Sequence, residues 1–308
     1  MAPPPVIVSL SIVLLLASCT EEVERSPGEP PSTPEPTPAP SPEPAPRRQS
    51  FVPPVDKPLP VSATGVARDL RRLERALSSS VFRWRRTDPP INARLPRDVA
   101  LPALYQQRIF RALARDAPLA RRVLSRLEGR TARALRRNVD AAAGLRSLVT
   151  PVEPDELFDT QRPEPPRVLL RYYRRAQSRF GVDWEVLAAI NFVETRFGRI
   201  RSSSVAGAQG PMQFIPSTWE AYGMGGDVHD PHDAIMAAAN YLNSSGAPND
   251  YQGALYAYNP AQEYVDAIWA YAREIMDDPR KYYVYYAYQV FMLTTEGDVR
   301  ITGPGPPR

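Results

Sequence analysis

The chain has 308 residues and a formal net charge of +4, which by itself does not indicate a nucleic-acid-binding protein. Its single cysteine excludes an internal disulfide, a zinc site built on several thiolates and an iron–sulfur cluster. Its two histidines argue against a Ser/His/Asp hydrolase and a histidine-rich metal enzyme. The 36 prolines are about twice the average share, so part of the chain is expected to lie outside any packed core.

An apolar run of 12 residues, Val6–Ala17, is too short to span a bilayer and fits the apolar core of a secretory signal. Leu16-Ala17-Ser18-Cys19 resembles the lipobox of bacterial lipoproteins. Residues 1–19 are therefore predicted to be a lipoprotein signal peptide, and Cys19 the lipidated first residue of the mature protein. This predicts an exported protein, lipid-anchored on the outer side of the bacterial cytoplasmic membrane, in the cell envelope. The alternative is an ordinary cleaved signal with a chance cysteine.

Residues 20–62 are predicted to form a disordered, proline-rich linker. Fourteen prolines lie between Pro27 and Pro60, mixed with Ser, Thr, Glu and Ala. Such a composition favours polyproline II and cannot bury a core. The segment would act as a spacer between the anchor and a folded part.

Residues 63–150 form an arginine-rich region that is predicted to be helical. Apolar residues recur every three or four positions, and Pro96, Pro118 and Gly129 interrupt them, which predicts four helices. The region holds 20 arginines against seven acidic residues. In an exported protein this charge favours contact with phospholipid head groups or anionic wall polymers, and no nucleic acid is expected as a partner. A solvated helix surface is the plainer interpretation.

Residues 151–279 are predicted to carry the chemistry. A helix is expected over Val168–Phe180, ended by Gly181, and a second is expected to begin at Asp183 as N-cap and to end near Gly198. In this second helix an apolar stripe contains one carboxylate, because Leu187, Ile190, Glu194 and Phe197 fall on one face. Burial and the negative end of the helix dipole both raise the pKa of such a carboxyl, as a general acid requires. The alternative is a salt bridge to Arg196 or Arg199.

The next segment, Ser204–Trp219, combines glycines with an uncharged polar residue on apolar surface. Gly207 and Gly210 permit tight turns. Gln213, between Met212 and Phe214, suits the amides and hydroxyls of sugars. Ser217 is expected to cap a short helix, Thr218–Tyr222.

Four motifs in order resemble the lysozyme-like catalytic domain of lytic transglycosylases, of both the soluble type and the membrane-bound B type. They are E-T-R-F-G, G-A-Q-G-P-M-Q-F-I-P-S-T-W, D-A-I-M-A-A-A-N-Y-L and A-Y-N-P-x-x-x-Y-V, and they cover about Pro165–Asp278. The chain departs from the pattern in having Thr195 where many relatives have serine after the glutamate. It also has Pro260-Ala261 where many have glycine.

The resemblance implies a helical lysozyme-like fold that acts on peptidoglycan glycan strands and needs no cofactor. Glu194 takes the position of the single catalytic glutamate, which serves as acid and then as base. The positions that match substrate-binding residues of the family are Ser204, Met212, Gln213, Tyr258 and Asn259. The implied reaction cleaves the MurNAc–GlcNAc β-1,4 bond and closes a 1,6-anhydro ring on MurNAc.

Two alternatives to this function stay open. If Asp227 or Asp230 reaches the cleft as a second carboxylate, a hydrolytic muramidase is the better interpretation. The third possibility is a non-catalytic peptidoglycan-binding or scaffold lipoprotein. The loop Gly223–Asp233 contains His229 and His232, but it lacks calcium-loop spacing, so no metal site is predicted and Asp230 is expected to cap the next helix.

Further helices are expected over His232–Leu242, Asp250–Tyr258 and Ala261–Met276. Residues 280–308 form a tyrosine-rich extension. Its β-propensity and the turn Glu296-Gly297-Asp298 predict a short β-hairpin that ends near Ile301. Its tyrosines are expected to pack on the domain rather than to stack on sugars.

Overall fold

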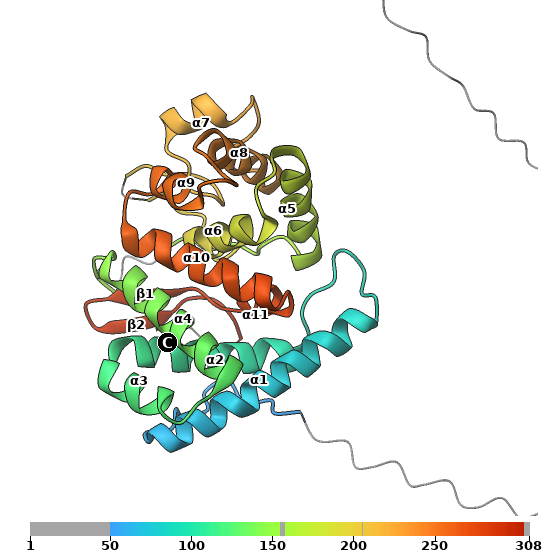
Figure 1. Cartoon of the computed structure of the whole chain (residues 1–308). Coiled ribbons are helices and arrows are strands. Elements are labelled where there is room, and N and C mark those ends of the chain that lie inside the picture. Colours follow the sequence, from blue (N-terminus) through green and yellow to red (C-terminus); the bar gives the residue numbers. More distant parts are fainter. Residues whose placement is uncertain (1–49, 155–157, 205, 305–308) are drawn as a thin grey trace, which may run out of the picture. The chain divides into compact units, whose positions relative to one another are not determined.

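The computed structural model describes residues 50–154, 158–204 and 206–304. The predicted signal peptide, Cys19 and residues 20–49 of the predicted linker lie outside this range. Eleven helices and one two-stranded antiparallel sheet are described (Figure 1), which confirms a mainly helical fold with a C-terminal hairpin. Within the described ranges no helix is both long and apolar enough to cross a membrane.

The arginine-rich region folds into the four predicted helices. They are α1 (Ala63–Arg86), α2 (Arg97–Arg115), α3 (Ala117–Leu124) and α4 (Gly129–Ser147). Two of the boundaries have a clear local cause: Pro96 stands at the N-cap of α2, and the Asp116 side chain accepts the Leu119 N–H at 2.8 Å at the start of α3. Their apolar faces form one core with the rest of the described chain.

The end of the predicted linker is ordered against these helices. Phe51 and Leu59 pack on the core, and the Phe51 ring meets the Tyr105 ring edge-on at 6.3 Å. The Arg108 guanidinium donates to the carbonyls of Val55 and Lys57 at 3.2 and 2.9 Å. Residues 50–62 were predicted to be part of the linker, but they belong to the folded part. Their few apolar side chains pack against the hydrophobic core.

Helix α4 packs along α10 (Gln262–Asp277), which joins the arginine-rich region to the segment that follows. At Gly144 an added Cβ would lie 3.4 Å from the Glu263 Cβ, so the two helices approach closely there. Arg137 of α4 binds Glu274 and Asp277 of α10 at 2.9 and 2.6 Å. The described elements belong to one unit, Arg48–Arg308. A division into separate domains at residue 150 stays a prediction.

Helix α6 (Trp184–Thr195) lies at the centre of the remaining helices. It packs against α5 (Pro166–Phe180), α8 (Pro231–Ser244), α10 and α11 (Arg280–Tyr286). Figure 1 shows α6 between α5 and α10, with α7 (Pro216–Tyr222) and α9 (Tyr251–Tyr258) in the same half of the unit. Almost every residue of α6 is buried, as its all-round apolar sequence dictates.

Most helix boundaries in this segment fall within two residues of the prediction, and two of the predicted caps are wrong. Helix α7 begins at Pro216, not Thr218, and its N-cap is Ile215, not Ser217. The fixed φ of proline suits the first helical position, so the helix starts there. Helix α6 was predicted to end near Gly198. It ends at Thr195, and Arg196 is its C-cap with a left-handed backbone.

The tyrosine run is helical, which corrects its predicted β conformation. Residues Arg280–Tyr286 form α11, and Lys281–Tyr286 are all buried. The hydroxyls of Tyr282 and Tyr286 donate to the carbonyls of Pro166 and Glu164 at 2.7 and 2.8 Å. Burial on all sides of the helix outweighs the β-propensity of tyrosine.

The predicted hairpin forms further along the chain. Strands β1 (Phe291–Thr294) and β2 (Gly297–Arg300) pair antiparallel, with Phe291 opposite Arg300 and Thr294 opposite Gly297. Asp298 of β2 binds Arg111 of α2 and Arg146 of α4, so the hairpin is fixed to the arginine-rich helices.

Candidate active site

The candidate site forms where α6 ends. Three consecutive residues, Arg196, Phe197 and Gly198, have left-handed φ values of 53°, 63° and 80°, which end the helix at Thr195. The buried Thr195 hydroxyl donates to the Pro211 carbonyl at 2.7 Å and accepts the Gly198 N–H at 2.8 Å. The helix end is thereby tied to the loop that contains Met212 and Gln213.

Glu194 lies in the last turn of α6 and is partly buried. Its carboxyl accepts a hydrogen bond from the Tyr264 hydroxyl, with Oε1 2.6 Å from the hydroxyl oxygen. Burial raises the pKa of the Glu194 carboxyl to about 7, although the Tyr264 hydrogen bond and the charge of Arg196 lower it. Glu194 can therefore hold a proton near neutral pH and release it when its surroundings change.

The predicted alternative of a salt bridge on Glu194 is not found among the described residues. The Arg199 guanidinium donates to the carbonyls of Arg196 and Tyr286, both at 2.8 Å. The Arg196 guanidinium donates to the Phe192 carbonyl and lies 4.5 Å from the centroid of that ring. Both guanidiniums thus donate to backbone carbonyls, and neither forms an ion pair with the glutamate among the described residues.

Tyr258 and Met212 meet beside Glu194. The Tyr258 hydroxyl donates to the Met212 carbonyl at 2.7 Å, and burial, with a smaller effect from the charge of Glu194, holds the pKa of Tyr258 well above its usual range. The Met212 side chain is fully buried, so its backbone, not its side chain, faces this contact. The Tyr258 ring lies between those of Phe214 and Tyr241, with centroids 6.0 and 5.6 Å away.

Gln213 is presented by a tight loop. Gln209 and Phe214 pair through two backbone hydrogen bonds of 2.9 Å, with Gly210 and Gln213 at left-handed φ values of 71° and 53° between them. The Gln213 side-chain amide donates to the Gly210 carbonyl at 3.0 Å and stays partly exposed. No described residue donates to its side-chain carbonyl oxygen, so this oxygen can accept from a ligand.

The other two predicted binding residues lie at the margin of this arrangement. Ser204 is exposed, and its hydroxyl accepts the Ala208 N–H at 3.0 Å within its own loop. Asn259 is the C-cap of α9, with its N–H bonded to the Leu255 carbonyl at 3.0 Å, and it is partly exposed. No described contact joins either side chain to Glu194.

The loop before α8 uses its carboxylates locally. Asp230 caps α8 as predicted, since its side chain accepts the N–H groups of His232 and Asp233. Asp227 accepts the His229 N–H at 2.9 Å, and His232 Nδ1 lies 3.0 Å from Asp233 Oδ1. Ligand atoms of Asp230, His232 and Asp233 come within 4.8 Å of one another. Asp230 already accepts two backbone hydrogen bonds as the N-cap of α8.

Sequence reasoning missed Tyr264, the residue in direct contact with the Glu194 carboxyl. It is the second tyrosine of the A-Y-N-P-x-x-x-Y-V motif, and that motif was its only signal. It also missed the role of Thr195, whose hydroxyl bonds to the Pro211 carbonyl and so joins the end of α6 to the loop that contains Gln213. The site thus combines one protonatable carboxyl, two tyrosines and a glutamine-bearing loop, which together can bind an uncharged polar ligand and move one proton.

Comparison with known families agrees with this geometry. Residues 171–274, about a third of the chain, match the family model described as Transglycosylase SLT domain. That match confirms the predicted lysozyme-like lytic transglycosylase family for this segment and includes Glu194, the Met212-Gln213 loop, Tyr258 and Tyr264. No curated protein and no solved structure matches the chain.

Proposed function

We propose that this chain is a peptidoglycan lytic transglycosylase that cleaves the MurNAc–GlcNAc β-1,4 bond and leaves 1,6-anhydro-MurNAc ends during cell-wall remodelling. The observation that carries the proposal is the Glu194 carboxyl, partly buried, bonded to Tyr264 and with its pKa raised to about 7 by burial. The match of residues 171–274 supports the substrate class.

The mechanism needs one carboxyl with two successive roles. Protonated Glu194 gives its proton to the glycosidic oxygen as the bond to C1 of MurNAc breaks. The resulting carboxylate then accepts the proton of the C6 hydroxyl of the same sugar, whose oxygen bonds to C1 and closes the anhydro ring. No water is consumed, and Glu194 returns to its protonated state.

The surroundings of Glu194 favour this mechanism over hydrolysis. Glycosidases that hydrolyse with two carboxylates hold them about 5 to 9.5 Å apart. Among the described residues, the groups that shift the pKa of Glu194 are Tyr264 and Arg196, and no carboxylate is one of them. Asp227 and Asp230, the predicted rivals, bond to backbone N–H groups of their own loop.

The remaining residues are assigned supporting roles in this proposal. Gln213 and Asn259 offer amide groups to the N-acetyl and hydroxyl groups of the glycan, with Ser204 at the margin. Tyr258 and the Met212 carbonyl shape the wall beside the acid. Tyr264 orients the carboxyl and stabilises its ionised form.

The experiment is digestion of purified sacculi followed by mass spectrometry of the products. Anhydro-muropeptides are expected, each lighter by one water than its reducing counterpart, and Glu194→Gln should abolish them. Glu185→Gln, in the first turn of the same helix, is the matched control and should keep the activity. Reducing ends would instead show a muramidase. Binding to sacculi without release of any fragment would show a scaffold protein.

We further propose that the protein acts in the cell envelope, lipid-anchored through Cys19, with the arginine-rich helices facing anionic head groups or wall polymers. Cys19 lies outside the described residues, and the proposal rests on the lipobox resemblance. Incorporation of a radiolabelled fatty acid in the producing cell, lost in Cys19→Ser, would test the anchor.

A further inference from the structure

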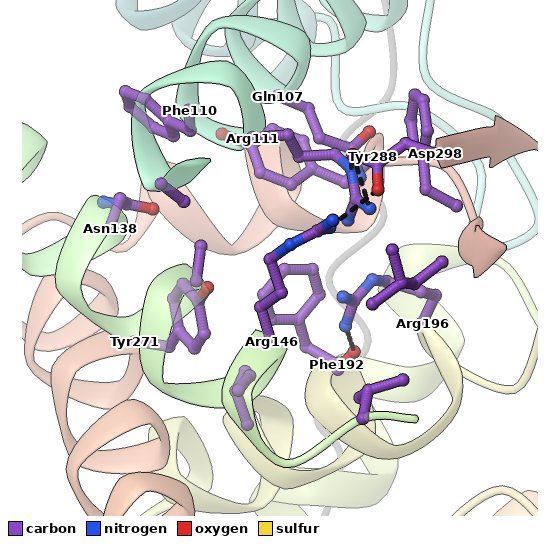
Figure 2. Close-up of a pocket in the computed structure, with 16 residues that line it drawn as sticks. Gln107, Phe110, Arg111, Asn138, Arg146, Phe192, Arg196, Tyr271, Tyr288 and Asp298 are labelled. Atoms are coloured by element: carbon purple, nitrogen blue, oxygen red, sulfur yellow. Dashed lines mark hydrogen bonds and ion pairs between the residues drawn. The ribbon is translucent and has the colours of Figure 1, made fainter. Parts of the chain in front are cut away.

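A cavity of about 150 Å³ lies beside the C-terminal end of α6, where Phe192 and Arg196 line it, whereas Glu194 and Tyr264 do not. It is bounded by α2, α4, α6, α10 and the C-terminal hairpin (Figure 2). A buried water needs a cavity of at least about 10–15 Å³, so this one has room for several waters or a small organic molecule. The proposed function assigns no role to this cavity.

Positive charge converges on the cavity. Arg111 and Arg146 bind Asp298 at 3.0 and 2.7 Å, and Arg115 binds the same carboxylate at 2.5 Å. Figure 2 shows Arg111 and Arg146 reaching Asp298 on one wall and Arg196 extending from α6 toward the same space. Three arginines thus bind one carboxylate, and a fourth, Arg196, lines the same cavity without binding it.

Arg196 forms no ion pair among the described residues, although its charge acts on Glu194. Its guanidinium donates to backbone carbonyls at the end of α6 and stacks on the Phe192 ring. Burial lowers the pKa of Arg196 to about 10, so it stays charged at neutral pH. A partly buried cation is stabilised by a counter-charge, and an arginine fork fits carboxylate and phosphate oxygens.

Aromatic rings supply the other walls. Phe110, Tyr271, Tyr288 and Phe291 line the cavity together with Phe192. The Arg111 guanidinium lies 4.8 Å from the Phe291 ring centroid, so this wall also holds an arginine in place. A pocket of rings with a few convergent charged groups is the usual form of a small-molecule site.

We propose that this cavity binds a small organic anion, with its carboxylate or phosphate at Arg111, Arg146 and Arg196 and its apolar or ring-bearing body against the aromatic wall. The rival interpretation is an ion-pair anchor that only holds the hairpin to α2 and α4. That interpretation accounts for the three arginines on Asp298, but it gives no role to the charge of Arg196, which lines the cavity without joining the ion pairs.

Calorimetric titration of the full-length protein at low ionic strength tests this directly. The probes are benzoate and phenyl phosphate, with benzyl alcohol as the neutral analogue and inorganic phosphate as the anion without a ring. The two aromatic anions are expected to bind at least about tenfold more tightly than either reference. Binding of benzyl alcohol equal to that of benzoate, or of inorganic phosphate equal to that of phenyl phosphate, would overturn the proposal, as would no binding at millimolar concentration.

Variants place the binding at this cavity. Arg146→Gln should weaken both aromatic anions about tenfold or more. Arg136→Gln, an exposed arginine of the same helix, is the matched control and should change nothing. Asp298→Asn removes the carboxylate that competes with the ligand for Arg111 and Arg146, so it should tighten binding. If the ion pairs only anchor the hairpin, the same variant should lower the thermal midpoint and bind no anion. Unchanged affinity in Arg146→Gln, with its fold verified by circular dichroism, would refute the assignment.

Discussion

The Tyr264 hydroxyl of α10 lies 2.6 Å from the Glu194 carboxyl of α6, although the two residues are 70 positions apart in the chain. This contact opposes the main electrostatic effect on the glutamate. Burial raises the pKa of Glu194, while the hydrogen bond from Tyr264 stabilises the ionised form and lowers it. The balance leaves the carboxyl near pH 7, where it can both donate and accept a proton.

Tyr264→Phe removes the lowering effect, so the pKa of Glu194 should rise. Since the proposed acid must be protonated to start the reaction, the alkaline limb of the kcat/KM profile should move to higher pH. The maximal rate should fall by roughly tenfold, because a charge-assisted hydrogen bond that orients the carboxyl is lost. The measurement is anhydro-muropeptide release across the pH range.

Tyr285→Phe is the control for that variant. Its hydroxyl donates to Asn138 Oδ1 at 3.0 Å, so the change also removes one buried hydrogen bond. It should lower stability without moving the pH profile. A Tyr264→Phe profile identical to that of the parent protein would show that Tyr264 does not set the protonation of Glu194.

The raised pKa of Glu194 also predicts a pH dependence of stability. The folded pKa of about 7 lies above the ordinary value of 4.5, so the folded state binds more protons between these pH values. The free energy of unfolding therefore falls as pH rises from about 4.5 through 7, by an amount on the order of 1–3 kcal/mol. Glu194→Gln removes this loss.

Urea unfolding at two pH values checks this prediction. Glu194→Gln should be more stable than the parent at pH 8 and nearly equal to it at pH 4. Glu220→Gln, at an exposed position of α7, should differ by less than about 0.5 kcal/mol at both. An equal effect of Glu194→Gln at the two pH values would contradict the raised pKa.

The sequence could predict the helices because their signals are local. Heptad-like spacing, Pro96 and Gly129 mark α1–α4, and the apolar stripe with one misplaced carboxylate identifies Glu194. The tyrosine run shows the limit of local signals. Its residues favour strands in general, but here they are surrounded on all sides by α1, α2, α6 and α10, and only the tertiary environment makes them helical.

The partners of Glu194 could not be predicted for a similar reason. A charged residue near the glutamate in sequence, Arg196 or Arg199, was the natural candidate, but both guanidiniums donate to backbone carbonyls and neither forms an ion pair with Glu194 among the described residues. The actual partner comes from α10, and its position depends on how α6 packs against that helix. Local spacing carries no information about such a long-range contact.

Two glycines near Gln213 offer a matched pair of substitutions. Both Gly207 and Gly210 have a left-handed φ, 78° and 71°, so alanine strains the backbone at each, by about 1 kcal/mol. At Gly207 nothing lies within 4 Å of the new Cβ, but at Gly210 the Val228 carbonyl oxygen would be 1.9 Å away. Gly210→Ala must therefore displace the loop that presents Gln213.

Gly210→Ala should lose most activity and about 2 kcal/mol or more of stability, whereas Gly207→Ala should keep most of both. Urea unfolding and product release from sacculi measure the two effects. Equal losses in the two variants would mean that the Val228 contact does not restrain the loop.

Thr195 provides the sharpest test of how the site is held together. Thr195→Val keeps the shape of the side chain but leaves the Pro211 carbonyl and the Gly198 N–H without their buried partner. Leaving buried polar groups unpaired costs about 1–3 kcal/mol each, so stability should fall by at least that amount. Activity should fall further than stability explains, because the end of α6 would no longer be tied to the loop of Met212 and Gln213. Thr195→Ser retains the hydroxyl and should restore the activity, and its failure to do so would assign the role of Thr195 to its methyl group instead.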